Sequence, residues 1–120
     1  MSSRSYRNNN PGNVDYSKDI DPKYGAKLED GPSPRFAKFP TAGKGLSYLL
    51  SELNSPKFQN LSISQAITLW APSSENDTQA YVDDVCEKST LTSGAVLSFL
   101  DAIQWLDLLR AIIEHEGYKK

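Results

Sequence analysis

Residues 96–116 read VLSFLDAIQWLDLLRAIIEHE and carry the longest apolar repeat in the sequence. Apolar side chains return every three or four residues, at Phe99, Leu100, Ile103, Leu106, Leu109, Ile112 and Ile113. A helix that is apolar over so broad an arc is usually the central, buried one. We therefore predict a buried helix over 96–116, followed by Gly117 as its C-terminal glycine.

Three shorter repeats predict helices over 42–54, 62–70 and 77–88. The first repeat is a leucine stripe that stops before Pro56, and the second follows Ser62, a good N-cap residue. The second ends at Trp70 because Pro72 disfavours helical geometry at the residue before it. Asn76 and Gln79 resemble a capping box for the third. We expect Trp70 to be buried against the last helix, and Cys86 to be buried and unreactive on an apolar face.

The N-terminal third differs from the rest of the chain in its amino-acid composition. Residues 1–44 hold five of the seven prolines and four of the seven glycines, which excludes long helices there. Arg35–Phe39 alternates and predicts a short strand with both aromatic residues on one face, with Val14–Tyr16 as its partner. The fold class is therefore mainly α (α+β), with about four helices and a small N-terminal ribbon.

We predict a single domain over 1–120, with a flexible tail over 1–6, a loop and ribbon half over 7–40 and a helical half over 41–117.

Composition excludes several classes of protein. The net charge is −2, so no basic excess is present for binding nucleic acid. With one histidine and one cysteine, the chain cannot form an intrachain disulfide or a zinc site of three His or Cys ligands, and we expect neither metal nor cofactor. Apolar runs fall short of the roughly 18 residues that a membrane span needs. Met1–Asn13 is polar, so we expect no secretory signal peptide and synthesis in the cytoplasm.

The remaining polar groups suit carbohydrate, because sugars are bound by aromatic faces and by Asn and Asp side chains, and carboxyl groups cleave glycosidic bonds. The most unusual stretch is Arg7-Asn8-Asn9-Asn10-Pro11-Gly12-Asn13. A second is Trp70-Ala71-Pro72, followed by Glu75-Asn76-Asp77-Thr78. Each is also what a polar surface loop or a capped helix start looks like.

These stretches, in this order, resemble a family of phage virion and prophage proteins similar to the lysozyme-like superfamily. The resemblance includes Arg35–Phe39, Gly45 at the start of a helix, and the ending Ala111-Ile112-Ile113-Glu114-His115-Glu116-Gly117. It spans about residues 7–117, and residues 88–100 show no feature of the family.

The resemblance implies a circularly permuted lysozyme-like fold. Lysozyme-like enzymes place a catalytic glutamate at the end of a helix, directly before a small hairpin. Here the helix with its Glu-Gly ending closes the sequence and the ribbon opens it. Joining the two ends would restore the lysozyme order, which is feasible where termini lie close together.

On this hypothesis Glu116 is the general acid, with its pKa raised by apolar neighbours. Substrate contacts would come from Asn8, Asn9, Asn10, Asn13 and Tyr16. The second carboxylate stays open among Asp15, Glu75 and Asp77. Lytic transglycosylases manage with one glutamate, so a missing partner would not exclude cleavage.

Three functions follow from this reading and remain open. The first is a muramidase or lytic transglycosylase that cleaves the β-1,4 bond of peptidoglycan, in a phage particle or delivered to the periplasm by another component. The second is a non-catalytic virion protein that keeps the fold to bind glycan or neighbouring virion subunits. The third is a small cytosolic helical adaptor. The partner expected for the first is the peptidoglycan glycan strand, with no membrane insertion and no nucleic acid.

Overall fold

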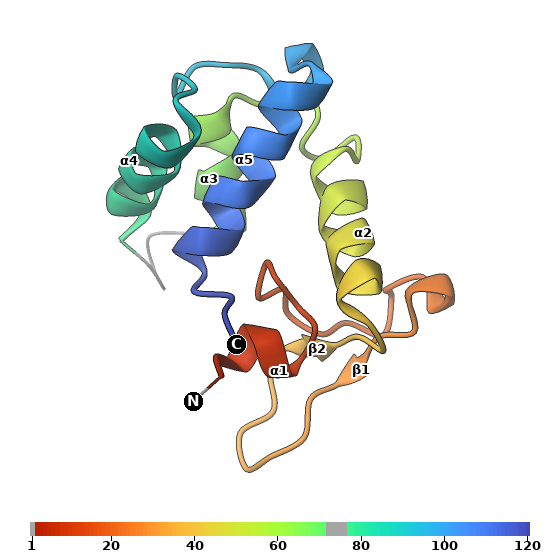
Figure 1. Cartoon of the computed structure of the whole chain (residues 1–120). Helices are drawn as coiled ribbons and strands as arrows, with labels where there is room; N and C mark the ends of the chain where they lie inside the picture. The colour runs from red at the N-terminus through yellow and green to blue at the C-terminus, as the bar shows by residue number, and fades with distance from the viewer. Residues whose placement is uncertain (1, 72–76) are drawn as a thin grey trace. The chain divides into compact units, whose positions relative to one another are not determined.

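The computed structural model describes residues 2–71 and 77–120 and divides into two compact units, Met1–Ser51 with Glu116–Lys120 and Glu52–His115. The described residues form five α-helices, two short 3-10 helices and one two-stranded antiparallel sheet (Figure 1). The protein is therefore mainly helical, with a small sheet near its N-terminus.

The first unit starts with a single helical turn. Helix α1 (Arg4–Arg7) begins at Ser3, whose hydroxyl accepts the N–H of Tyr6 at 3.2 Å. A 3-10 turn (Pro22–Tyr24) follows, then strands β1 (Lys27–Leu28) and β2 (Ala37–Lys38), which pair antiparallel with Leu28 opposite Ala37. Helix α2 (Ala42–Leu53) leaves the sheet and ends in the second unit. The segment 1–6, expected to be a flexible tail, thus contains most of α1.

Strand β2 has a neighbour on each side. Asp15 forms an antiparallel bridge with Phe36, and Ala37 donates its N–H to the carbonyl of Val14 at 3.0 Å, so the predicted partner segment is confirmed. The partner β1, on the other side, was not predicted. The expectation that Phe36 and Phe39 share a face was wrong, because residues three apart lie on opposite faces of a strand. Ala37 and Phe39 are buried, while the Phe36 ring lies under the Arg4 guanidinium.

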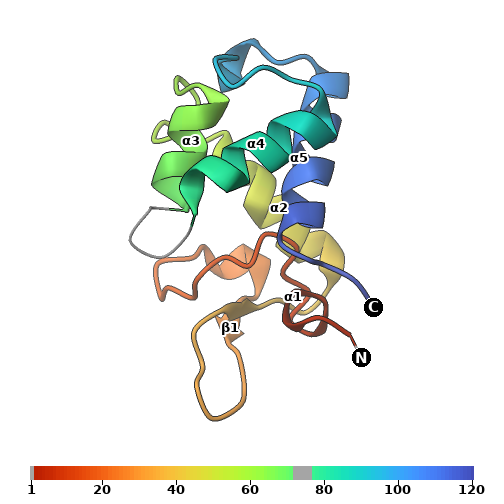
Figure 2. The same cartoon turned by 90° about the vertical axis from the view of Figure 1, so that its left-hand side faces the viewer.

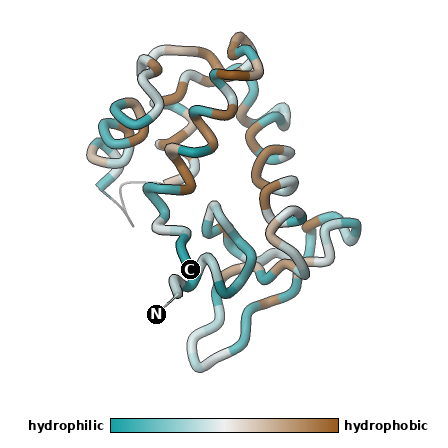
Figure 3. Tube along the Cα trace, viewed as in Figure 1, coloured by the Kyte–Doolittle hydropathy of each residue, from teal (hydrophilic) through white to brown (hydrophobic). Residues whose placement is uncertain are grey.

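The core of the first unit is aromatic. Phe39 is 1% exposed, and its ring lies 5.7 Å from that of Tyr48. Tyr24 meets the same Tyr48 ring edge-on at 5.3 Å. Leu49, one residue further along α2, is also 1% exposed. Much of the chain from 1 to 40 is hydrophilic in Figure 3, so this small cluster holds a largely polar loop region together.

The second unit is a helical cluster. Its helices are α3 (Ile63–Trp70), α4 (Thr78–Ser89) and α5 (Ala102–His115), with a 3-10 turn at Leu97–Phe99. Helix α4 packs against both α3 and α5, as Figure 2 shows. The buried side chains are Leu53, Phe58, Ile63, Ala66, Ile67, Ala71, Tyr81, Val82, Val85, Leu97, Leu108, Leu109, Ala111 and Ile112.

The predicted buried helix over 96–116 needs correction. Helix α5 starts only at Ala102, because Asp101 and Gln104 cap it reciprocally, each side chain bonding the other's backbone N–H at 2.8–2.9 Å. Its first turns are not buried, since Ile103 is 66% and Leu106 57% exposed, and Phe99 in the preceding 3-10 turn is 84% exposed. The buried part of the predicted arc lies at Leu109 and Ile112.

The other predicted helices agree closely with the structure. Ser62 caps α3 with Gln65 in a capping box, and α3 ends at Trp70 as predicted. The cap of α4 is Asp77, whose carboxylate accepts the N–H of Ala80; Asn76 lies outside the described residues. No helix in the described ranges is long and apolar enough to cross a membrane.

Two burial predictions were too strong. Cys86 is only half-buried, although partial burial and the nearby Asp83 raise the pKa of its thiol and so disfavour the thiolate. Trp70 is also half-buried. Its ring meets Phe58 edge-on, and it lines a small apolar cavity together with Leu108 and Ile112 of α5.

Candidate functional site

The asparagine-rich stretch Asn8–Asn13 forms a folded loop in the first unit. Asn9 and Asn13 have left-handed backbone angles, with φ of 51° and 49°, which asparagine tolerates better than most residues. Asn10 between them is 1% exposed. Its amide donates to the carbonyls of Val14 and Ala37, both at 2.9 Å, and its side-chain oxygen accepts the N–H of Val14. Asn10 was expected to bind substrate, but its polar atoms are engaged inside the protein.

Asn8 is likewise buried, at 6% exposure, and donates to the carboxylate of Glu29 at 2.8 Å. Asn9 is half-buried and donates to the carbonyl of Phe39 at 3.0 Å. The side chains of Asn8, Asn9 and Asn10 therefore anchor the loop to the residues around the sheet. In this structure the side-chain amides of Asn8 and Asn10 are thus engaged within the protein.

The loop also lies directly on the first turn of α2. A Cβ atom on Gly45 would lie 1.9 Å from the carbonyl oxygen of Asn9, far inside van der Waals contact. The backbones can approach this closely only because Gly45 has no side chain. This explains why a glycine stands at the start of α2, a position where the sequence pattern gave no reason for one.

Glu116 meets the far end of the same loop. It follows α5 directly and precedes Gly117, which takes the left-handed conformation expected for a C-terminal glycine (φ 74°). The Asn13 amide lies 3.4 Å from both the Glu116 carboxylate and its backbone carbonyl. The Asn13 side-chain oxygen is buried and has no hydrogen-bond partner among the described residues. Of the residues expected to form the site, the structure thus brings together Glu116 and Asn13.

The chain ends meet beside this contact. Ser3 donates its backbone N–H to the carbonyl of Lys119 at 2.9 Å, and the Lys119 N–H donates to the Ser3 hydroxyl at 3.0 Å. The Tyr6 and Tyr118 rings pack at 5.4 Å. Figure 1 shows the marked N- and C-terminal ends close together.

The other predicted site residues have varied surroundings. Asp15 is exposed and pairs with Arg35 at 2.8 Å. Tyr16 is 36% exposed and available to solvent. Asp77 caps α4 in the second unit, and Glu75 lies outside the described residues.

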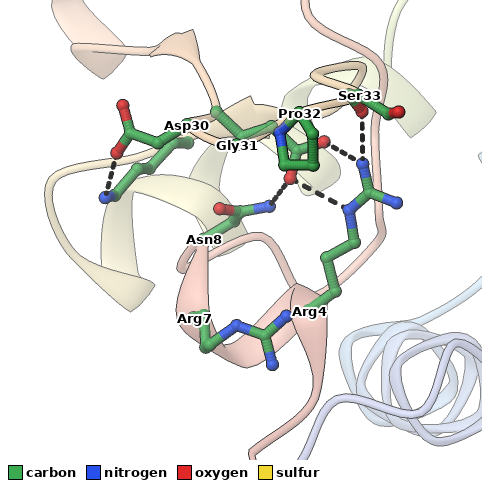
Figure 4. Close-up of a pocket in the computed structure, with 9 residues that line it drawn as sticks. Arg4, Arg7, Asn8, Asp30, Gly31, Pro32 and Ser33 are labelled. Atoms are coloured by element: carbon green, nitrogen blue, oxygen red, sulfur yellow. Dashed lines mark hydrogen bonds and ion pairs between the residues drawn. The ribbon is translucent and has the colours of Figure 1, made fainter.

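A polar pocket of about 490 Å³ lies on the first unit beside α1, and sequence reasoning missed it (Figure 4). At its wall, the buried Glu29 carboxylate accepts a hydrogen bond from Arg4 Nε at 3.0 Å. It also accepts hydrogen bonds from the backbone N–H groups of Arg35 and Phe36, both at 2.9 Å. A second Arg4 nitrogen and the Asn8 amide complete the set. Arg4, with these N–H donors, holds the pKa of Glu29 well below its usual range, although burial acts in the opposite direction.

Further charged residues line the pocket. Lys38 pairs with Asp30 at 3.2 Å, and Arg7 donates to the carbonyl of Ser2 at 2.5 Å. Arg4 and Glu29 are 25 residues apart and share no periodic pattern, so the sequence offers no signal for their pairing. In the part of the chain that the structure describes, no three His, Cys, Asp or Glu side chains cluster as metal ligands would.

In the second unit, α4 and α5 are joined by a polar contact. His115 Nδ1 lies 2.7 Å from an Asp84 carboxylate oxygen, and the His115 ring packs on Tyr81 with centroids 3.7 Å apart. Asp84 also pairs with Lys88 at 2.5 Å. Lys88 and, to a smaller extent, His115 lower the pKa of Asp84. The pair fixes the end of α5, the helix that leads into Glu116.

Comparison with known proteins gives a phage relative. No family model matches the chain. Protein P5 of Pseudoalteromonas phage PM2 is 32% identical to it over 88 residues, which are 72% of this chain and 55% of that protein. The chain therefore spans about half the length of the curated relative it matches. Over most of its own length, it is similar to a phage protein.

Proposed function

We propose that the protein is a lysozyme-like, peptidoglycan-directed protein of a phage particle or prophage, which cleaves the β-1,4 glycan bond with Glu116 as general acid. The observation that carries this proposal is the contact between Glu116 and Asn13 at 3.4 Å. A general acid needs a defined orientation at a partly shielded position. The half-burial of Glu116 and its contact with the Asn13 amide support this role.

The contact also supports a permuted lysozyme order. Because Ser3 bonds to Lys119, the path from the Glu116-Gly117 ending runs almost directly into α1 and the asparagine-rich loop. Within the first unit, Glu116 is thus followed by α1 and the asparagine-rich loop, which is the order that the permuted hypothesis requires. Similarity to a phage protein agrees with a setting in which cell-wall cleavage is useful.

Substrate contacts in this proposal come from Asn13 and Tyr16. The unpartnered side-chain oxygen of Asn13 could accept a hydrogen bond from a sugar hydroxyl after a small movement. The Tyr16 ring is exposed enough to lie against a sugar face. Asp15 is the remaining candidate for a second carboxylate in the first unit, where it pairs with Arg35.

The decisive experiment measures cleavage of purified sacculi by the release of soluble muropeptides. Glu116→Gln keeps the shape and hydrogen-bonding capacity of the side chain but removes its ionisable proton. We expect its rate to fall by a factor of roughly several hundred, as for the loss of a general acid. Glu114→Gln is the matched control, because Glu114 is an exposed glutamate near the same helix end. Equal activity of the two variants would refute the assignment.

A second candidate function is supported by the internal use of the asparagines. Asn8 and Asn10 stabilise the loop, so the motif would persist in a protein that had lost catalysis. Such a protein would serve in the virion by binding glycan or neighbouring virion subunits. Wild-type protein that sediments with sacculi but releases no muropeptides would establish this alternative.

A further inference from the structure

The pocket beside α1 carries charges of both signs within one cavity. Its lining includes Arg4, Arg7 and Lys38 and the carboxylates of Glu29 and Asp30 (Figure 4). With about 490 Å³, it is large enough for a few amino-acid residues. It is formed entirely within the first unit, by α1, the segment after β1 and the Lys38 end of β2.

The charged side chains of the pocket differ in how many hydrogen bonds and ion pairs they already make within the protein. Glu29 accepts hydrogen bonds from two side chains and two backbone N–H groups, and it is buried, so it forms part of the wall. Arg4 is held by Glu29 and by the Ser33 carbonyl, yet its side chain remains 44% exposed. Arg7 is exposed and has no carboxylate partner among the residues that the structure describes. Arg7 is therefore the cation most available to an incoming carboxylate.

Asp30 is the exposed negative charge of the pocket. Its side chain is 79% exposed, and it forms an ion pair with Lys38, whose side chain is 34% exposed. An exposed pair of this kind contributes little to stability and can exchange partners at low cost. Asp30 can thus accept an ammonium or amide N–H of a ligand, while Lys38 turns to the ligand's carboxylate.

We infer that this pocket binds a zwitterionic peptide segment, with a carboxylate at Arg7 and Lys38 and an amino or amide group at Asp30. A phosphate group fits less well, because two pocket carboxylates would lie near its double negative charge. This inference rests on the proposed function, since the peptide stems of peptidoglycan carry free carboxylates and amino groups of this kind. It implies that the protein prefers glycan that still bears its peptides over bare glycan.

The test compares two soluble ligands by isothermal titration calorimetry: a disaccharide with its tetrapeptide stem, and the same disaccharide without the peptide. We expect the peptide-bearing fragment to bind at least tenfold more tightly. Arg7→Gln and Lys38→Gln should each reduce that preference by about tenfold or more. Lys18→Gln, at an exposed lysine outside the pocket lining, should leave it unchanged. Circular dichroism would verify that each variant is folded.

The outcomes separate this inference from the proposed catalysis. Equal affinity for the two fragments, or an unchanged preference in Arg7→Gln, would overturn the inference. Competition by millimolar inorganic phosphate as strong as that by the free tetrapeptide would also overturn it, because it would indicate a general anion site. Glu114→Gln, at an exposed glutamate outside the pocket lining, should bind both fragments as the wild type does. A protein that shows the peptide preference but does not cleave sacculi would refute the catalytic proposal and leave this inference standing.

Discussion

Asn10 joins two separate segments of the first unit through one buried side chain. It bonds the backbone of Val14 four residues away and that of Ala37 27 residues away. A buried amide is favourable only when its donors and acceptor are all used, and here they are. The same capacity suits sugar hydroxyls, so the sequence alone could not distinguish an internal role from a ligand-binding one.

Replacing Asn10 with alanine should therefore destabilise the protein strongly. The change removes the partner of the Val14 N–H and the Asn10 hydrogen bond to the Ala37 carbonyl in a buried site, and leaves the Val14 carbonyl with the Ala37 N–H alone. We expect a loss of about 3 kcal/mol in the free energy of unfolding, measured by urea denaturation. Asn60→Ala, at an exposed turn residue, should change it by less than about 0.5 kcal/mol. A loss of similar size in both variants would contradict the role assigned to Asn10.

Glu29 makes stability depend on pH in a defined direction. Its pKa is lowered in the folded protein, chiefly by Arg4 and with help from the Phe36, Asn8 and Arg35 N–H donors. The folded state therefore holds the proton less tightly than the unfolded chain does. The resulting stabilisation is complete above the unfolded pKa of about 4.3 and is lost as the pH falls below it.

Thermal melts between pH 3 and pH 7 would measure this effect. The wild-type melting temperature should fall steadily below about pH 5. Glu29→Gln should be less stable than the wild type by about 3 kcal/mol at pH 7, because Arg4 loses its buried partner. Its melting temperature should also change less at acidic pH. A variant whose pH profile runs parallel to that of the wild type would show that another carboxylate is responsible.

At the scale of elements, the approach between α2 and the asparagine-rich loop depends on Gly45. An alanine there would place its Cβ against the Asn9 carbonyl, which is backbone and cannot rotate away. We expect Gly45→Ala to destabilise the first unit by about 3 kcal/mol. Gly43→Ala is the control, because its Cβ would meet its nearest neighbour, the Thr41 hydroxyl, at 3.9 Å. That change should be neutral or stabilising by about 0.5 kcal/mol in a thermal melt, since alanine favours helix. Comparable losses in the two variants would mean that the loop can move aside.

Helix positions could be predicted from the sequence where local signals decide them. The leucine stripe located α2, and the Ser62 cap and Pro72 located α3. The start of α5 was misplaced because the apolar arc continues upstream of Asp101. There the capping pair of Asp101 and Gln104 fixes the helix start, and a hydrophobic pattern carries no information about it. Strand β1 was missed because a two-residue strand has no readable period.

At the scale of the whole molecule, the sequence order indicated one contact of the candidate site and gave no indication of the charged pocket. A helix with a Glu-Gly ending at one terminus and an asparagine-rich loop at the other led to the expectation that they meet, and Glu116 does contact Asn13. The charged pocket arises from residues scattered between Arg4 and Lys38, whose pairing depends on the folded path of the chain. Only the structure brings Arg4, Asn8 and Glu29 together.

The pairing of the two chain ends leads to a last prediction. The first unit is assembled from residues 1–51 and 116–120, so its two pieces are connected only through the second unit. Linking the ends with a short Gly/Ser segment would close this loop at a place where Ser3 and Lys119 already touch. Closure restricts the unfolded chain far more than the folded one. By the loop-closure estimate for a loop of more than one hundred residues, the cyclic protein should be more stable by about 5 kcal/mol.

Thermal unfolding of the cyclised protein and of a linear control that carries the same linker would measure the difference. We expect a melting temperature several degrees higher for the cyclic form. Its near-ultraviolet circular dichroism should be unchanged, since the Tyr6–Tyr118 packing is already present in the linear chain. If the cyclic form melted at or below the temperature of the control, the ends would not be paired in solution. The spatial continuity from Glu116 through α1 to the loop, on which the permuted order depends, would then be lost.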